Sequence, residues 1–137
     1  MLYPLFAMVI LTFAVAIVAV RARFHSVRAK EVPISYFRDM QEKSGITVPE
    51  RIQITTRCFN NQFEVPVMFY AAGVSAMALG VETTLTIVTA WLFVISRCVH
   101  AWIHLTYNHI LHRMRAFWVA MLWVLLLWLE LLAARLF

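Results

Sequence analysis

Residues 57–79 read RCFNNQFEVPVMFYAAGVSAMAL, an apolar stretch whose first eight residues include an arginine, two asparagines and a glutamate. A charge in the membrane interior costs about 2.5 to 3.5 kcal/mol even on the lenient insertion scale, so such side chains face a partner or a watery cavity. Arg57, Asn61 and Glu64 are separated by four and three residues, which places them along one stripe of a helix. The stretch predicts a membrane-spanning helix with a polar site on one face.

A second polar stripe occurs in the next apolar stretch. Arg97, His100, His104 and Asn108 follow at intervals of three, four and four residues. Because consecutive spans run in opposite directions, we expect the two stripes to meet. The depths of Glu64 and Arg97 are then comparable, and we expect them to form an ion pair.

Composition indicates an integral membrane protein. Of the 137 residues, 63% are hydrophobic and only 14% are charged, and the mean hydropathy is +0.78. This leaves too little polar surface to cover a soluble globule of this size. A bilayer core about 30 Å thick takes about 20 helical residues to cross. Such stretches lie at about residues 2–20, 57–79, 83–107 and 116–136. The sequence predicts an all-α, four-helix membrane bundle in which residues 1–137 form a single transmembrane domain.

Positive charge predicts how the bundle is oriented. Eight of the twelve Lys and Arg residues lie between Arg21 and Arg57, and Arg113 and Arg115 separate the third and fourth spans. Lys and Arg favour the cytoplasmic side, so we expect the connection at residues 21–56 to be cytoplasmic and both termini to lie on the opposite side. The first stretch has no basic residue before it, which favours a retained span over a cleaved signal.

The basic residues of the long connection are mixed with acidic ones, so no nucleic-acid partner is expected, whereas membrane lipids are. Within this connection, residues 35–43 are expected to form a short interfacial helix with Tyr36, Phe37 and Met40 on one side. Two cysteines, Cys58 and Cys98, are too few to indicate a disulfide framework.

Three segments together resemble a known superfamily: RCFNNQFEVP at residues 57–66, RCVHA at residues 97–101 and the basic turn through Arg113. They resemble the MAPEG superfamily, the membrane-associated proteins of eicosanoid and glutathione metabolism, and the likeness covers nearly the whole chain. The resemblance implies a four-helix protomer that assembles as a homotrimer. It also implies a glutathione site between protomers that opens toward the cytoplasm.

The resemblance assigns roles to the two stripes. Arg57, Asn61 and Glu64 are similar to the second-helix residues that hold the glutathione backbone. Arg97 and His100 match the third-helix arginine and the His or Tyr one turn further on. All five residues are therefore candidate ligands of glutathione, which would serve as a co-substrate.

Further candidates come from outside these five positions. Arg21 is similar to the basic residue that closes the site from the next protomer, and His104 stands where well-studied enzymes often have a tyrosine. Asn60 stands where some of them carry another arginine. Arg113 and Arg115 are alternative matches for the catalytic arginine beside the thiol, because the spacing of that turn varies within the family.

The string HAWIHLTYN at residues 100–108 resembles a bacterial branch of the superfamily without established chemistry, and a bacterial inner membrane is the expected location. The favoured function is a glutathione-dependent transferase or peroxidase that acts on a lipophilic electrophile. One alternative is a non-catalytic accessory or structural subunit of a larger membrane complex. Another is a metal-binding protein that uses the pairs His100 with His104 and His109 with His112, although no metal is expected.

Overall fold

A computed structural model describes residues 1–39 and 47–136. The described residues form helices and contain no strand. In chain order, the elements are α1 (Leu2–Arg28), α2 (Tyr36–Asp39), α3 (Glu50–Asn60), the 3₁₀ helix η1 (Asn61–Phe63), α4 (Val65–Leu79), α5 (Thr84–Leu105) and α6 (Ile110–Leu136).

Four helical segments are long and apolar enough to cross a membrane: Leu2–Arg28, Glu50–Leu79, Thr84–Leu105 and Ile110–Leu136. The second of them comprises α3, η1 and α4. The all-α class with four such helices is therefore confirmed. Three of the four are longer than the apolar runs expected from sequence, because a helix continues past the hydrocarbon wherever its backbone stays paired.

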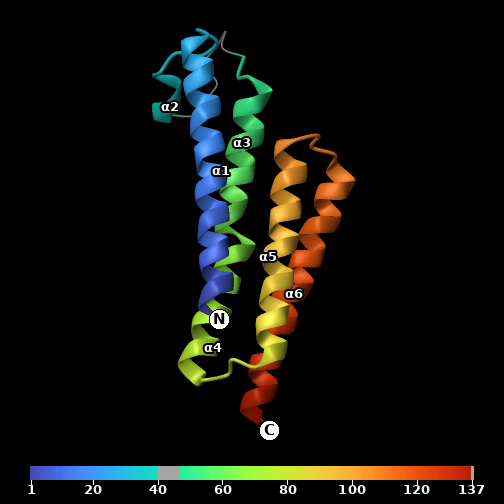
Figure 1. Ribbon diagram of the computed structural model, residues 1–137. Helices are drawn as coiled ribbons and strands as arrows, with labels where there is room; N and C mark the ends of the chain where they lie inside the picture. Colours follow the sequence, from blue (N-terminus) through green and yellow to red (C-terminus); the bar gives the residue numbers. More distant parts are fainter. Residues whose placement is uncertain (40–46, 137) are drawn as a thin grey trace.

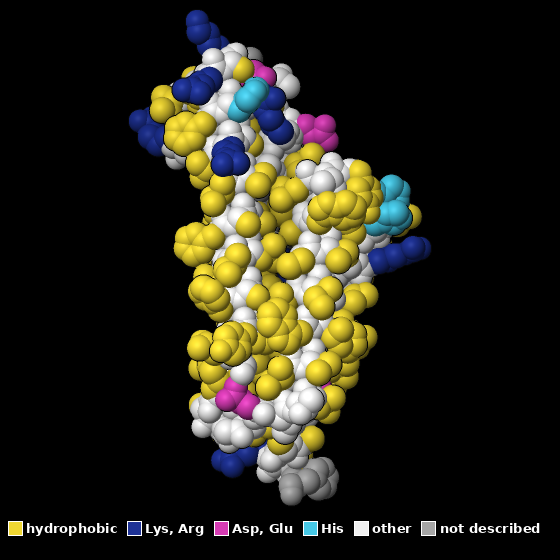
Figure 2. Space-filling model, viewed as in Figure 1, with side chains coloured by type: hydrophobic (Ala, Val, Ile, Leu, Met, Phe, Trp, Pro, Cys, Tyr) yellow, Lys and Arg dark blue, Asp and Glu magenta, His cyan; other side chains and the backbone are white. Residues whose placement is uncertain are grey.

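The helices pack in two pairs (Figure 1). Helix α1 lies along α3, and α5 lies along α6, with α4 in contact with both α1 and α6. The α5–α6 turn and the connection after α1 lie at one end of the molecule, and the α4–α5 turn lies at the other, with both termini toward it. In Figure 2, hydrophobic side chains cover the middle of the visible face, while basic and histidine side chains gather mainly near the first of these ends.

The main hydrophobic core lies where α1, α4, α5 and α6 meet. Phe69 of α4 and Phe93 of α5 are fully buried, and their rings stack with centroids 4.3 Å apart. Met8 from α1 and Leu127 from α6 belong to the same core. Gly73 of α4 also contributes, since a Cβ atom there would lie 2.5 Å from a methyl group of Leu5, and its absence lets α1 approach closely.

The second span is broken at residues 61–64, which is the most consequential local feature of the fold. After α3 the chain makes the short 3₁₀ turn η1, and Glu64 then has φ −96° and ψ −98°, outside the helical region. Pro66 lies in the first turn of α4, where its missing N–H costs nothing, but it cannot donate a bond back to α3 or η1. The break therefore separates a single apolar stretch into two helices at the level of the polar stripe.

Side-chain amides form hydrogen bonds with backbone carbonyl groups around this break. The amide nitrogen of Gln62 donates to the carbonyl oxygen of Cys58 at 3.2 Å, and that of Asn61 donates to Arg57 at 2.9 Å. Irregular backbone at membrane depth is tolerated only where such groups are satisfied within the protein or line a cavity. The polar residues of this stretch thus have a structural role in addition to any role in binding.

The long connection folds against the ends of α1 and α3. Val32, Tyr36, Val48 and Ile52 form a small buried cluster there, against which Phe37 also packs. The expected interfacial helix is present as α2, which covers four residues of the expected range. Residues 40–43 of that range, which include Met40, lie outside the described residues.

One ion pair links the connection to α3 and predicts a pH dependence. The guanidinium of Arg51 donates to the carboxylate of Glu31, while its Nε donates to the hydroxyl of Ser26 at 3.0 Å. The hydrogen bond from Arg51 lowers the pKa of Glu31 below its ordinary value of 4.5. A lowered folded-state pKa contributes stability that is present above the unfolded value and is lost as the pH falls through the folded value.

We therefore expect acidification from about pH 5.5 to about pH 3 to increase amide hydrogen exchange at the start of α3, after correction for intrinsic rates. The effect is small because the pair is exposed. Glu31→Gln should show the faster exchange already at the higher pH. Glu50→Gln, which alters a nearby exposed acid, should keep the acid-induced increase. An equal response in the wild type and Glu31→Gln would contradict the prediction.

Candidate functional site

A pocket of about 360 Å³ lies among α3, η1, α5 and the start of α6. Its walls combine polar residues predicted from sequence with apolar residues that were not predicted. The polar ones are Arg57, Asn61, His100, His104 and Arg113, and the apolar ones are Ile110, Met114 and Phe117. The two stripes therefore do meet, and α6 adds a third wall.

Arg97 lies deeper than this pocket. Its side chain is 0% exposed, and its Nη2 donates to the backbone oxygen of Asn61 at 2.8 Å, across the break in the second span. The other two guanidinium nitrogens, Nε and Nη1, are buried without a hydrogen-bond partner among the described residues. Buried donors of this kind normally have hydrogen-bond partners. The guanidinium of Arg97 contacts the pocket residue Asn61 and lacks partners for two of its nitrogens among the described residues.

The expected ion pair between Glu64 and Arg97 is not formed in the described part of the chain, where no carboxylate oxygen lies within 4.0 Å of Arg97. Glu64 is exposed and does not line the pocket, although it is near enough to interact electrostatically with Arg97. The prediction assumed one continuous α-helix with about 3.6 residues per turn. The 3₁₀ turn, with about 3.0 residues per turn, and the break after it place Glu64 off the stripe.

Asn108 holds Arg113 at the edge of the pocket. Asn108 has a positive φ of 45°, and its backbone nitrogen donates to the carbonyl of Ile103 at 2.8 Å, which closes the end of α5. Its side-chain oxygen accepts a 2.7 Å hydrogen bond from Nη1 of Arg113. Asparagine tolerates the left-handed region better than most residues, so one side chain both forms the turn and positions the guanidinium.

The structure separates Arg113 from Arg115. Two residues correspond to about 200° around a helix, so the two side chains leave α6 on nearly opposite sides. Arg113 lines the pocket described above, whereas Arg115 lines a different groove together with Tyr107 and His112. The geometry thus favours Arg113 of the two alternative matches.

His100 and His104 face each other on α5. Their ring centroids are 5.7 Å apart, and each side chain is only 2% exposed. Nδ1 of His100 and both ring nitrogens of His104 are buried without a partner among the described residues. Together with Arg97, they give the pocket and its floor several unpaired polar atoms, which is the pattern expected of a site that takes up a polar ligand or water.

The second histidine pair lies apart from the first. His109 and His112 have ring centroids 4.5 Å apart near the α5–α6 turn, and neither lines the pocket. Within residues 1–39 and 47–136, no group of three or more His, Cys, Asp and Glu side chains could hold a metal ion. The metal-binding alternative would therefore need ligands from outside these described residues.

Comparison with protein families gives one match. A model of the MAPEG family matches residues 1–133. The chain belongs to the MAPEG family. No curated protein and no solved structure matches it. The resemblance inferred from residues 57–66 and 97–101 is confirmed. Of the residues that it assigned to a site on the second and third spans, Arg57, Asn61, His100 and His104 line the pocket, whereas Glu64 and Arg97 do not.

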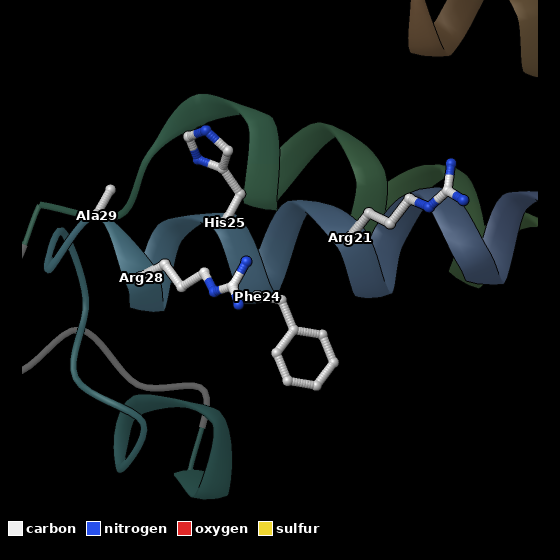
Figure 3. A pocket seen from close by; sticks show the side chains of 5 residues that line it. All are labelled: Arg21, Phe24, His25, Arg28 and Ala29. Carbon is white, nitrogen blue, oxygen red and sulfur yellow. The ribbon is translucent and has the colours of Figure 1, made fainter.

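Arg21 does not reach this MAPEG pocket within one chain. It lies on α1 beside a separate surface hollow that is also lined by Phe24, His25 and Arg28 (Figure 3). Figure 3 shows Arg21 and His25 projecting from one side of α1 and Phe24 from another. Arg21 would therefore have to contact the pocket of another protomer in order to contribute to such a site.

The apolar wall of the pocket was not predicted from the sequence, although the spacing of its residues in the sequence indicates it. Ile110, Arg113, Met114 and Phe117 follow at intervals of three, one and three residues, the spacing of one helix face. The fourth span was expected to begin only at residue 116, which left Ile110, Arg113 and Met114 in a turn. Helix α6 in fact begins at Ile110, so its first two turns belong to the site.

Proposed function

We propose that the chain is a glutathione-dependent transferase or peroxidase that acts on a lipophilic electrophile or peroxide. The observation that supports this most directly is the shared pocket of Arg57, Asn61, His100, His104 and Arg113. Its volume of about 360 Å³ falls within the range of about 300 to 1,000 Å³ that is typical of small-molecule sites. Membership of the glutathione-associated MAPEG family supports the same ligand.

The charge of the pocket suits glutathione. This tripeptide carries two carboxylates and one ammonium group, and guanidinium groups bind carboxylates through paired hydrogen bonds. In the proposal, Arg57 and the unpaired nitrogens of Arg97 bind carboxylates, while the amide of Asn61 binds the peptide backbone. The buried nitrogens that have no partner among the described residues would then be satisfied by ligand atoms.

Arg113 activates the thiol in this proposal. A free cysteine thiol has a pKa of about 8.5, and a nearby guanidinium lowers it, which raises the fraction present as thiolate at neutral pH. In a transfer reaction, the thiolate sulfur forms a bond to the electrophilic carbon, and the leaving group departs with the electron pair of the bond that breaks. With a hydroperoxide, one thiolate attacks the terminal oxygen of the O–O bond to give a sulfenic acid and an alkoxide, which takes up a proton to become the alcohol. A second glutathione thiol then reacts with the sulfenic acid to give the disulfide and water.

The apolar wall fits a substrate that comes from the bilayer. Ile110, Met114 and Phe117 border the polar part of the pocket. Ile110 is 63% exposed and Met114 is 50% exposed. A lipophilic molecule could therefore contact this wall while the thiolate is held beside Arg113. A site inside the membrane gives such a molecule access without passage through water.

Assembly as a homotrimer completes the proposed site. The MAPEG family is often trimeric. In the trimer, Arg21 would close the pocket of the adjacent protomer, and exposed Glu64 would bind the glutathione ammonium. Both assignments follow the family pattern of residues that serve the site from the second helix and from a neighbouring first helix.

The proposal predicts that glutathione stabilises the purified protein against heat. A ligand that binds only the folded state at about 100 times its Kd adds about 2.7 kcal/mol, so a clear rise in Tm is expected at millimolar glutathione. Arg57→Ala should abolish the shift, whereas Arg135→Ala, an exposed arginine at the far end of α6, should retain it. The measurement is the melting curve in detergent with glutathione and with its S-methyl derivative.

Two results would count against the proposal. An equal shift in Arg57→Ala and Arg135→Ala would place the ligand elsewhere. No shift in the wild type, together with tight copurification of other chains, would favour the accessory-subunit alternative.

A further inference from the structure

A second groove of about 500 Å³ lies on the outer side of the α5–α6 pair, separate from the glutathione pocket. One end of the groove is polar and is formed by Tyr107, His112 and Arg115. Apart from Ser96, whose hydroxyl donates to the carbonyl of Leu92, the rest of it is apolar. Because no residue lines both cavities, the groove would keep its function whether or not the chain uses glutathione.

The polar end of the groove presents positive charge and hydrogen-bond donors. The hydroxyl of Tyr107 lies 3.2 Å from Nδ1 of His112, which fixes the two rings beside each other at the α5–α6 turn. Arg115 is exposed, and no carboxylate lines this groove among the described residues. A bound anion would supply the missing counter-charge.

The apolar part runs along an exposed surface of α5 and α6, two of the helices that are long and apolar enough to cross a membrane. Ile95, Val99 and Val119 are 55%, 45% and 44% exposed, and they line the groove below the polar end. Ile95 and Tyr107 are twelve residues apart on α5 and its C-terminal turn, a length of about 18 Å at about 1.5 Å per residue. Half of a bilayer core is about 15 Å thick, so the groove has the depth of one leaflet.

We propose that this groove binds one anionic phospholipid of the leaflet on the α5–α6 turn side. The headgroup phosphate contacts Arg115 and the Tyr107–His112 pair, and an acyl chain lies across Ile95, Val99 and Val119. A cationic end and an apolar channel one leaflet deep occur together in this groove, and that combination matches an anionic lipid. A basic residue near a membrane surface attracts anionic lipids more than zwitterionic ones.

Native mass spectrometry of the purified full-length protein tests this proposal. The probes are dioleoyl phosphatidylglycerol, which is anionic, and dioleoyl phosphatidylcholine, which has the same acyl chains without net charge. We expect one phosphatidylglycerol per chain to be retained in preference to phosphatidylcholine. Arg115→Gln should weaken phosphatidylglycerol retention at least about fivefold and leave phosphatidylcholine unchanged. Arg135→Gln, at the opposite end of the same helix, should behave as the wild type.

A second variant tests the apolar channel. Val99→Trp fills the groove without altering a charge and should reduce retention of both lipids. The proposal is overturned if Arg115→Gln and Arg135→Gln lose phosphatidylglycerol equally, or if the wild type does not distinguish the two lipids. It is also overturned if Val99→Trp changes the number of subunits while retained lipid stays constant, because the groove would then be an interface between copies of the chain.

Discussion

Replacing Arg113 by glutamine is expected to lower the rate of glutathione transfer to a lipophilic electrophile by about 10²-fold or more, the loss that follows removal of one preorganised electrostatic contact to a reacting group. The side chain lines the pocket and is held there by its 2.7 Å hydrogen bond to Asn108. Without the guanidinium, the pKa of the thiol of bound glutathione should return toward about 8.5. The pH at which the rate reaches half its maximum should rise accordingly. The measurement is a pH–rate profile with thiolate absorbance as a second readout.

The matched control is Arg115→Gln, two residues away on the same helix. Its side chain lines the outer groove, so the rate and the pH profile should stay as in the wild type when both proteins are assayed in the same lipid. Asn108→Gly separates charge from positioning, since it removes the hydrogen bond, keeps the guanidinium and tolerates the positive φ of this position. We expect an intermediate loss with little change in the pH profile. Equal losses in Arg113→Gln and Arg115→Gln would remove the basis for assigning thiol activation to Arg113.

Replacing Arg97 by methionine is expected to abolish the stabilisation by glutathione while leaving the unliganded protein folded. Removing one partner of a buried ion pair costs about 3 to 5 kcal/mol, which corresponds to a loss of affinity of more than about 100-fold. In the unliganded chain, however, the guanidinium makes one hydrogen bond to the described residues, and its Nε and Nη1 have no partner among them. Methionine removes a costly buried charge together with the hydrogen bond from Arg97 to the carbonyl of Asn61, a loss of about 1 to 3 kcal/mol, so the two effects largely offset each other.

Melting curves with and without glutathione check this expectation, and Arg135→Met is the control for loss of an exposed arginine. If Arg97 serves only to hold the break in the second span, Arg97→Met should melt far below the wild type even without ligand. That result would show the residue to be structural. A normal melting temperature combined with an unchanged response to glutathione would exclude Arg97 from the binding site.

The fold was largely predictable from the sequence because a membrane restricts a chain to very few solutions. Backbone groups in hydrocarbon must pair within their own segment, so an apolar stretch of about 20 residues without a barrel pattern has to be a helix. The boundaries of those helices were less predictable. Ile110 begins α6 six residues before the apolar run expected at residue 116, since helix formation does not stop where hydrophobicity does.

The candidate site was predictable in composition but not in arrangement. Spacing grouped Arg57 and Asn61 with His100 and His104, because the two histidines lie on one unbroken helix and Asn61 caps the end of α3 with helical dihedral angles, before the break changes the period. It failed for Glu64, which follows the 3₁₀ turn, and it could not choose between Arg113 and Arg115 without knowing where α6 begins and which side faces α5.

The amino-acid sequence by itself determined the membrane-spanning class, the number of long apolar helices and the two polar stripes, because hydrophobic length and helical period are local properties of the chain. Only the tertiary structure decided how those stripes meet. The break between α3 and α4 turns Glu64 away from the pocket, and Arg97 is paired with the backbone of Asn61, a contact across 36 positions of sequence. Such contacts depend on which helix faces which, and that is set by the packing of all the helices together.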